Sequence, residues 1–147
     1  MITYWDTSAF VPLLIAEADS VAYRELWDGS VAVVSTRLLY VEASAALHQA
    51  HRIGRLDSSQ LQTNLSTLDD YWPGFNVVEL DEALMLHGAE AAGRFRLRGY
   101  DAVHCAAGLL IAADPHAVLV SGDARLLAAW QSAGAATAAI SPGAGQR

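Results

Sequence analysis

Short apolar runs alternate with segments of helical periodicity along nearly the whole chain. Runs that are apolar on both faces predict four strands, at 2–5, 31–34, 75–80 and 117–120, and a weaker run predicts a fifth at 136–140. Apolar residues three and four positions apart predict helices over 20–27, 36–52, 57–71, 81–96, 101–113 and 123–133. This alternation predicts an α/β fold, with a central parallel sheet of four to five strands flanked by helices.

The periodicity also predicts which face of two of these helices is buried. A separate signal, an aspartate before the first turn, predicts the N-cap of a third helix. Apolar positions predict a buried stripe over 36–52 and another over 81–96. The first comprises Leu38, Val41, Ala45 and Ala46, and the second comprises Leu84, His87, Ala91 and Phe95. Asp19 is the expected N-cap of the helix at 20–27.

The length and the single cysteine set the broad class. A chain of 147 residues predicts one domain, over 1–140, followed by a small, polar and flexible tail at 141–147. The lone Cys105 excludes an internal disulfide and a thiol metal cluster. The N-terminus lacks the basic region of a signal peptide, and the longest apolar run, 105–113, is too short to cross a bilayer. We therefore expect a cytoplasmic protein with no membrane segment.

Four acids stand where a parallel sheet would bring them together. Asp6 ends the first strand, and Asp123 follows the strand at 117–120. Asp101 opens the helix at 101–113, and Glu42 lies about two turns into the helix at 36–52. Ligand sites in open α/β sheets lie at the carboxyl edge of the strands, so we expect these four side chains to share that edge.

Each acid also has a structural explanation. Asp101 and Asp123 are equally well explained as helix N-caps, and Asp6 as a turn residue that accepts backbone hydrogen bonds. Glu42 is harder to explain in this way, because it shares a face with Leu38 and should point toward the core. A carboxylate in that position needs a partner or a cation, and no arginine lies three or four positions away.

Carboxylates that meet at one edge repel one another, and a raised pKa or a bound divalent ion relieves the repulsion. Oxygen ligands without cysteine suit Mg²⁺ or Mn²⁺ rather than Zn²⁺. Such an ion lowers the pKa of a water molecule and neutralises phosphate charge. The expected chemistry is therefore metal-assisted hydrolysis of a phosphodiester.

Four motifs carry these acids, and together they resemble the acidic motifs of PIN-domain ribonucleases, in particular the VapC toxins of bacterial toxin–antitoxin pairs. The motifs are Tyr-Trp-Asp-Thr-Ser-Ala-Phe at 4–10, Val-Glu-Ala-Ser-Ala-Ala-Leu at 41–47, Arg-Gly-Tyr-Asp-Ala-Val-His at 98–104 and Val-Ser-Gly-Asp-Ala-Arg-Leu at 120–126. The resemblance covers about residues 2–140. It implies a PIN-like fold and an endoribonuclease that depends on Mg²⁺ or Mn²⁺, uses a metal-activated water and leaves 5′-phosphate and 3′-hydroxyl ends.

The resemblance also implies roles for individual residues and partners. Asp6, Glu42, Asp101 and Asp123 fall on the four acidic positions. Asp6 and Asp101 are the expected direct metal ligands, whereas Glu42 and Asp123 hold waters or a second ion. Ser8 and Ser121 fall on hydroxyl positions that could orient Asp6 or bind a phosphate. The implied partners are RNA, a small antitoxin whose C-terminal segment blocks the site, and a second copy of the chain in a homodimer.

The net charge and the absence of lysine limit which partners and which protein classes the sequence allows. The net charge is −7, from 16 acids and nine basic residues, all of them arginine. An acidic chain speaks at first against an RNA partner, but setting aside the four site acids leaves 12 acids to face nine arginines. Without lysine, P-loop proteins, dehalogenase-type phosphatases and receiver domains are excluded. A PIN fold that has lost catalysis and serves as a binding or regulatory module remains the alternative.

Two further features admit two interpretations. Arg94, Arg96 and Arg98 precede Asp101, either as a strip that contacts phosphate or as solvated residues that complement a helix dipole. Arg98 is the member closest in sequence to the predicted site, and so the expected substrate contact. His104 lies one turn after Asp101, either in contact with the metal site or packed and hydrogen-bonded in the core.

Overall fold

The expected parallel sheet is confirmed in a computed structural model, which describes residues 1–138 and 140. The strands are β1 (Ile2–Trp5), β2 (Ala32–Thr36), β3 (Phe75–Val78), β4 (Ala117–Val120) and β5 (Thr137–Ala138), in the order β3-β2-β1-β4-β5 and all parallel. The chain builds outward from β1 to β3 and then crosses to the other side of β1. The switch point of the topology therefore lies between β1 and β4.

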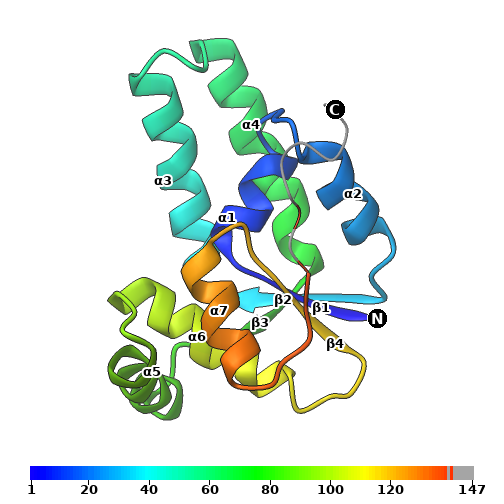
Figure 1. The fold of residues 1–147 in the computed structure, drawn as a ribbon. Coiled ribbons are helices and arrows are strands. Elements are labelled where there is room, and N and C mark those ends of the chain that lie inside the picture. Colours follow the sequence, from blue (N-terminus) through cyan, green and yellow to red (C-terminus); the bar gives the residue numbers. More distant parts are fainter. Residues whose placement is uncertain (139, 141–147) are drawn as a thin grey trace.

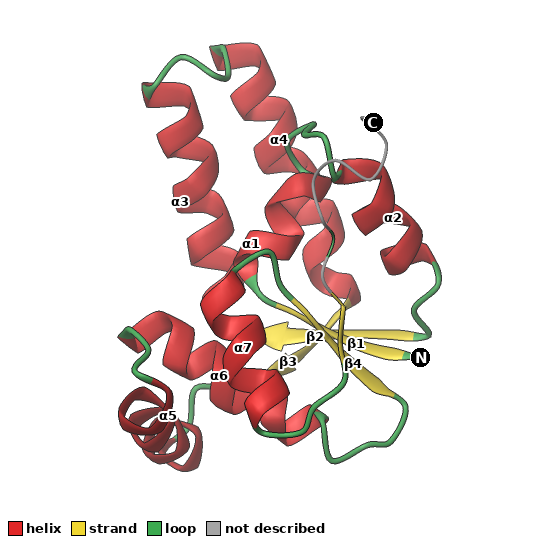
Figure 2. Cartoon of the chain, viewed as in Figure 1, coloured by secondary structure: helices red, strands yellow, loops and turns green. Residues whose placement is uncertain are grey.

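Helices cover both faces of the sheet, as Figures 1 and 2 show. In chain order they are α1 (Thr7–Phe10), α2 (Ser20–Asp28), α3 (Leu38–Arg52), α4 (Ser58–Tyr71), α5 (Glu82–Phe95), α6 (Gly99–Ile111) and α7 (Ala124–Ser132), with short 3₁₀ turns η1 (Val11–Leu13) and η2 (Trp72–Gly74). Helices α1 to α4 lie on one face and α5 to α7 on the other. Within the described residues, no helix is both long enough and apolar enough to cross a membrane.

The central strand divides the core in two. Tyr4 and Trp5 are both fully buried but point to opposite faces, because successive side chains of a strand alternate. Trp5 joins a cluster of aromatic residues under α1 to α4, and Tyr4 packs edge-on against Trp130 of α7 under α5 to α7. A strand buried on both faces explains why the sequence shows an unbroken apolar run here.

Local sequence explains several helix boundaries. Asp57 and Gln60 form a reciprocal capping box at the start of α4, with both bonds 2.8 Å long. Asp81 caps α5 by accepting a bond from the Leu84 amide. Helix α5 ends at Arg96, which adopts the left-handed conformation with φ of 55°. Asp19 stands at the N-cap position of α2, but its side chain makes no capping bond there.

Two of the predicted core stripes were wrong in detail. Helix α3 buries Leu39, Ala43, Leu47 and Ala50, whereas Val41 on the expected stripe is 62% exposed. In α5 the predicted Leu84 and Ala91 are buried, but Gly88 is buried in place of the predicted His87, which is exposed. Apolar residues lie on both candidate faces of α3, so periodicity alone could not show which face packs on the sheet.

Some predicted boundaries also differ. Strand β2 begins at Ala32 and extends to Thr36, which leaves Val31 81% exposed. Helix α6 begins at Gly99, two residues before the predicted start at Asp101. The predicted tail at 141–147 lies outside the described residues, so the proposed division into a domain and a tail stays a prediction.

Candidate active site

The predicted acids are arranged around the carboxyl ends of β1 and β4. Asp6 follows β1 directly, and Ser121 and Asp123 follow β4, which pairs with β1 in register from Ile2 to Trp5. Helix α3 contributes Glu42 from its second turn, and α6 contributes Asp101 from its first. The site therefore occupies the switch point of the sheet, where open α/β folds place their ligands.

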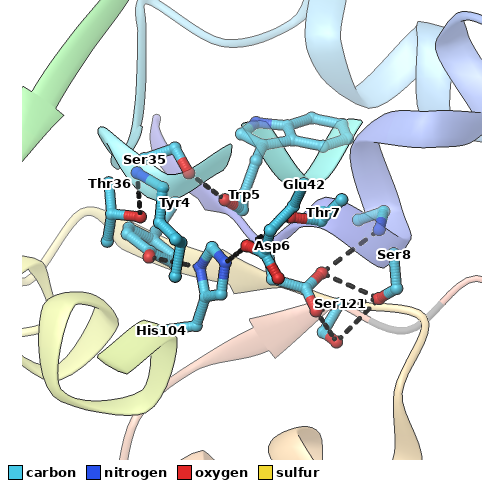
Figure 3. Close-up of polar contacts among 12 residues, drawn as sticks. Tyr4, Trp5, Asp6, Thr7, Ser8, Ser35, Thr36, Glu42, His104 and Ser121 are labelled. Atoms are coloured by element: carbon cyan, nitrogen blue, oxygen red, sulfur yellow. Dashed lines mark hydrogen bonds and ion pairs between the residues drawn. The ribbon is translucent and has the colours of Figure 1, made fainter. Parts of the chain in front are cut away.

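Asp6 is the most buried of the four acids, at 4% exposure. The Ser8 hydroxyl lies 2.9 Å from both of its carboxylate oxygens, the Ser121 hydroxyl donates to Oδ2 at 3.0 Å, and the Ala9 amide donates to Oδ1 at 3.1 Å (Figure 3). Burial raises the pKa of Asp6 to about 6, although these bonds and His104 act in the opposite direction. Ser8 and Ser121 therefore hold this carboxylate in one orientation.

Glu42 is held by a buried histidine from another helix. His104 Nε2 lies 2.6 Å from Glu42 Oε1, and His104 Nδ1 lies 2.8 Å from the Tyr4 hydroxyl (Figure 3). The Thr7 hydroxyl donates to the same Glu42 oxygen at 2.9 Å. Burial raises the pKa of Tyr4 well above its usual value, so this hydroxyl keeps its proton. The His104 imidazole therefore bridges the Tyr4 hydroxyl and the Glu42 carboxylate.

These contacts show what local sequence reasoning missed. His104 is packed and hydrogen-bonded in the core, as one interpretation held, but its partner is Glu42, one of the four acids. Tyr4 and Thr7 carried no signal of their own, since Tyr4 is an apolar position of the first strand and Thr7 follows the strand by two residues. The partner that Glu42 needs comes from 62 positions away, which no search for nearby arginines can find.

Asp101 and Asp123 differ in their local roles. Asp123 is the N-cap of α7, where Oδ1 accepts bonds from the amides of Arg125 at 2.8 Å and Leu126 at 3.2 Å. Asp101 is no N-cap, because α6 begins at Gly99 and Asp101 lies in its first turn. The structural explanation as a cap therefore applies to Asp123 and is wrong for Asp101.

Electrostatics link the acids to one another. Burial raises the pKa of Asp101, and the negative charges of Asp123 and Glu42 raise it further, against the positive influence of His104 and Arg98. A hollow of about 460 Å³ is lined by Glu42 and Asp101 together with Arg98, Gly99 and Tyr100. An arginine and an exposed tyrosine thus flank two carboxylates in one open hollow.

The residues fit a hard divalent ion. Within the described residues, no three His, Cys, Asp or Glu side chains converge closely enough to form a ready-made cage for a metal. Mg²⁺ does not require one, since it keeps several waters and needs only one or two carboxylates. The available donors are carboxylate and hydroxyl oxygens, and burial raises the pKa of both Asp6 and Asp101 by disfavouring their charged forms. A bound cation would stabilise those charged forms.

Comparison with known proteins gives a consistent result. The family model of the PIN domain matches residues 3–129. The chain is 39% identical over 133 residues to Ribonuclease VapC45 and to Ribonuclease VapC49, from two strains of Mycobacterium tuberculosis, covering 90% of this chain and 92% of each relative.

Two solved structures share the fold. One is VapBC2 from Rickettsia felis, solved with a DNA fragment from its promoter, which matches with a TM-score of 0.65 at 11% identity over 96% of this chain and all of that one. The other is PAE2754 from Pyrobaculum aerophilum, with a TM-score of 0.63 at 23% identity over 95% of this chain and 83% of that one.

Proposed function

The chain belongs to the PIN-domain family, and from that premise we propose that it is an endoribonuclease, the toxin component of a VapC-type toxin–antitoxin pair. Nucleases of this kind are generally metal-dependent, and for this chain the oxygen-only donor set favours Mg²⁺ or Mn²⁺. The single observation that carries the proposal is Asp6. It is a buried carboxylate at the switch point of the sheet, held by hydroxyls and one amide, and its charge is not balanced by an ion pair in the described chain.

We assign roles to the site residues from their surroundings. Asp6 and Asp101 would hold the ion directly, while Glu42 and Asp123 would hold waters or a second ion. A divalent ion in this place supplies a water of lowered pKa and neutralises phosphate charge. Ser8 and Ser121 keep Asp6 oriented. Arg98 lines the hollow with Asp101 and would bind a phosphate of the substrate there.

The partners follow from the relatives. We propose that RNA is the substrate and that a small antitoxin is the cognate partner, in line with the two mycobacterial ribonucleases and the VapBC2 structure that this chain resembles. We also propose that two copies of this chain form a homodimer within the toxin–antitoxin complex.

The test compares cleavage of a labelled RNA by the parent protein, Asp6→Asn and Asp101→Asn, with Mn²⁺ and with EDTA. Asp28→Asn, which removes the same charge from an exposed position on α2, is the matched control. We expect cleavage by the parent and the control with Mn²⁺ only, and loss of at least about 100-fold in the two site variants. Equal cleavage by all four proteins would indicate a contaminating nuclease.

Sequencing of 5′-phosphate RNA ends after induced expression, with Asp6→Asn as the reference, identifies the substrate. A discrete cut absent from the reference supports the proposal. If the parent binds Mn²⁺ by calorimetry yet cuts no RNA, the catalytically silent binding module becomes the better description.

A further inference from the structure

Only some of the arginine side chains have a partner in the described part of the chain. Arginine supplies all of the fixed positive side-chain charge, because the chain has no lysine. Among the described arginines, Arg37 and Arg55 form ion pairs with Glu79 and Glu17. Arg24 and Arg52 donate hydrogen bonds to Tyr71 and Gln49. The other four, Arg94, Arg96, Arg98 and Arg125, are exposed and make neither an ion pair nor a side-chain hydrogen bond within the part of the chain that the structure describes.

Two of these arginines share one hollow. Arg96 at the end of α5 and Arg125 in the first turn of α7 line a hollow of about 530 Å³. Its other lining residues are Phe95, Ala128, Ala129 and Ser132. Arg125, Ala128, Ala129 and Ser132 follow the spacing of one helical face, and small side chains after Arg125 leave that face open. No acid lines this hollow, in contrast to the one beside Glu42 and Asp101.

The hollow adjoins the candidate active site. Arg125 lies two residues after Asp123, and its amide donates to the Asp123 carboxylate at 2.8 Å. Arg98, two residues after Arg96, lines the hollow that contains Asp101. The segment 96–98 therefore joins the two hollows along the chain, and Arg125 places the start of α7 beside the site acid Asp123.

The backbone at Arg96 is unusual for an arginine. It is the one described residue other than glycine with positive φ, at the C-terminal cap of α5. Left-handed conformation costs an L-residue about 1–2 kcal/mol, and glycine is the usual residue at such a helix end. Glycine would satisfy the backbone at this position without strain, so the arginine side chain is retained at a cost in stability. Such a cost points to a role for the guanidinium outside the fold.

We propose that the hollow between Arg96 and Arg125 is a subsite for backbone phosphates of an RNA strand, next to the scissile phosphate, an inference that rests on the proposed ribonuclease function. Two guanidinium groups without carboxylate partners suit the planar, bidentate recognition of phosphate. The position beside Asp123 favours RNA over an acidic protein segment, because a strand that reaches the acids must continue past one side of the site.

The salt dependence of RNA binding tests this subsite. The proteins carry Asp6→Asn to prevent cleavage, and a labelled single-stranded RNA is titrated in EDTA across a KCl series by fluorescence anisotropy. The test variant adds Arg96→Gln and Arg125→Gln. The matched control instead adds Arg24→Gln and Arg52→Gln, which remove the same charge from exposed arginines on α2 and α3.

We expect the slope of log K against log [KCl] to become shallower by about 1.4 in the test variant, since each phosphate contact to a single strand contributes about 0.7. The control should keep the parent slope. Equal slope changes in the two variants would mean a general effect of net charge and would overturn the proposal, as would an unchanged slope in the test variant. A labelled poly-glutamate serves as the second probe. Weakened poly-glutamate binding with unchanged RNA binding would assign the hollow to an acidic protein and also overturn it.

Arg96→Gly separates binding from folding. Glycine relieves the left-handed strain, so the variant should melt about 2–4 °C higher while its RNA affinity falls. A lower melting temperature would show that the Arg96 side chain supports the fold, against the proposal. Cleavage assays distinguish the two levels of inference. If the parent cuts RNA while the slope is unchanged, the subsite alone fails, and if the slope changes while no cleavage occurs with Mn²⁺, the proposed hydrolysis fails.

Discussion

Asp6 should make the metal-free protein less stable as the pH rises. Its pKa is about 6 in the folded protein, against 3.8 for an unperturbed aspartate, because burial disfavours the charged form. A group whose folded pKa is raised binds its proton more tightly in the folded state, so its contribution to stability is complete below about pH 3.8 and is lost as the pH rises through about 6. The difference between the folded and the unfolded pKa of Asp6 corresponds to about 3 kcal/mol of unfolding free energy, at about 1.36 kcal/mol for each pKa unit.

The assay is urea denaturation of the parent and of Asp6→Asn in EDTA, from pH 4 to pH 7.5. Other acids titrate in both proteins, so the difference in unfolding free energy between the two isolates Asp6. The asparagine side chain of the variant alters the bonds to Ser8 and Ala9 at every pH, so it adds a constant to the difference in unfolding free energy. We expect the parent to lose about 2.5 kcal/mol relative to the variant across this range, because part of the full difference is already lost at pH 4.

Added Mg²⁺ should reverse much of that loss in the parent at pH 7.5 and stabilise the variant much less, because the ion offsets the buried charge. A stability difference that stays constant with pH would refute the reasoning. It would mean that the hydroxyl and amide donors around Asp6 fully compensate for its burial.

Two further predictions concern side chains in the core. His104→Leu should lower the unfolding free energy by about 1–3 kcal/mol and weaken Mn²⁺ binding by calorimetry, because Glu42 loses its buried partner. His104→Gln, whose amide nitrogen reaches the Nε2 position, should recover much of both, and equal losses in the two variants would contradict a positioning role. Gly108→Ala should destabilise the fold by about 1–3 kcal/mol in thermal denaturation, since the new methyl group would lie 2.8 Å from the buried ring of Trp130. Gly93→Ala, on α5 with open space around it, should instead stabilise the protein by about 0.5–1 kcal/mol, and the same sign for both would refute the packing argument.

The sheet was predictable because its central strands, β1, β2 and β4, are buried on both faces. Strands β1 and β4 were predicted residue for residue from their apolar runs. The α3 core face was not predictable, because Leu38 and Leu39 are adjacent and equally apolar, and only packing on the sheet selects Leu39. The four acids could be located from sequence because each stands at or near a strand end or a helix start. Their partners could not, since the bond between His104 and Glu42 joins two helices that are distant along the chain.

A structural role and a role in the site were treated as alternatives from sequence, at Asp6 as a turn residue and at Asp123 as a helix N-cap. In the structure both side chains cap a helix at the edge of the sheet where the site lies. A cap fixes a carboxylate at a helix N-terminus, because a side-chain oxygen accepts a bond from a backbone amide of the first turn. At Asp123 both capping bonds fall on Oδ1, so that Oδ2 accepts none of the bonds in the described chain. At Asp6 the amide bond also falls on Oδ1, while the serine hydroxyls reach Oδ2. Capping therefore holds both carboxylates in a fixed orientation at the switch point of the sheet, which is the rigidity that the proposed metal ligands would need.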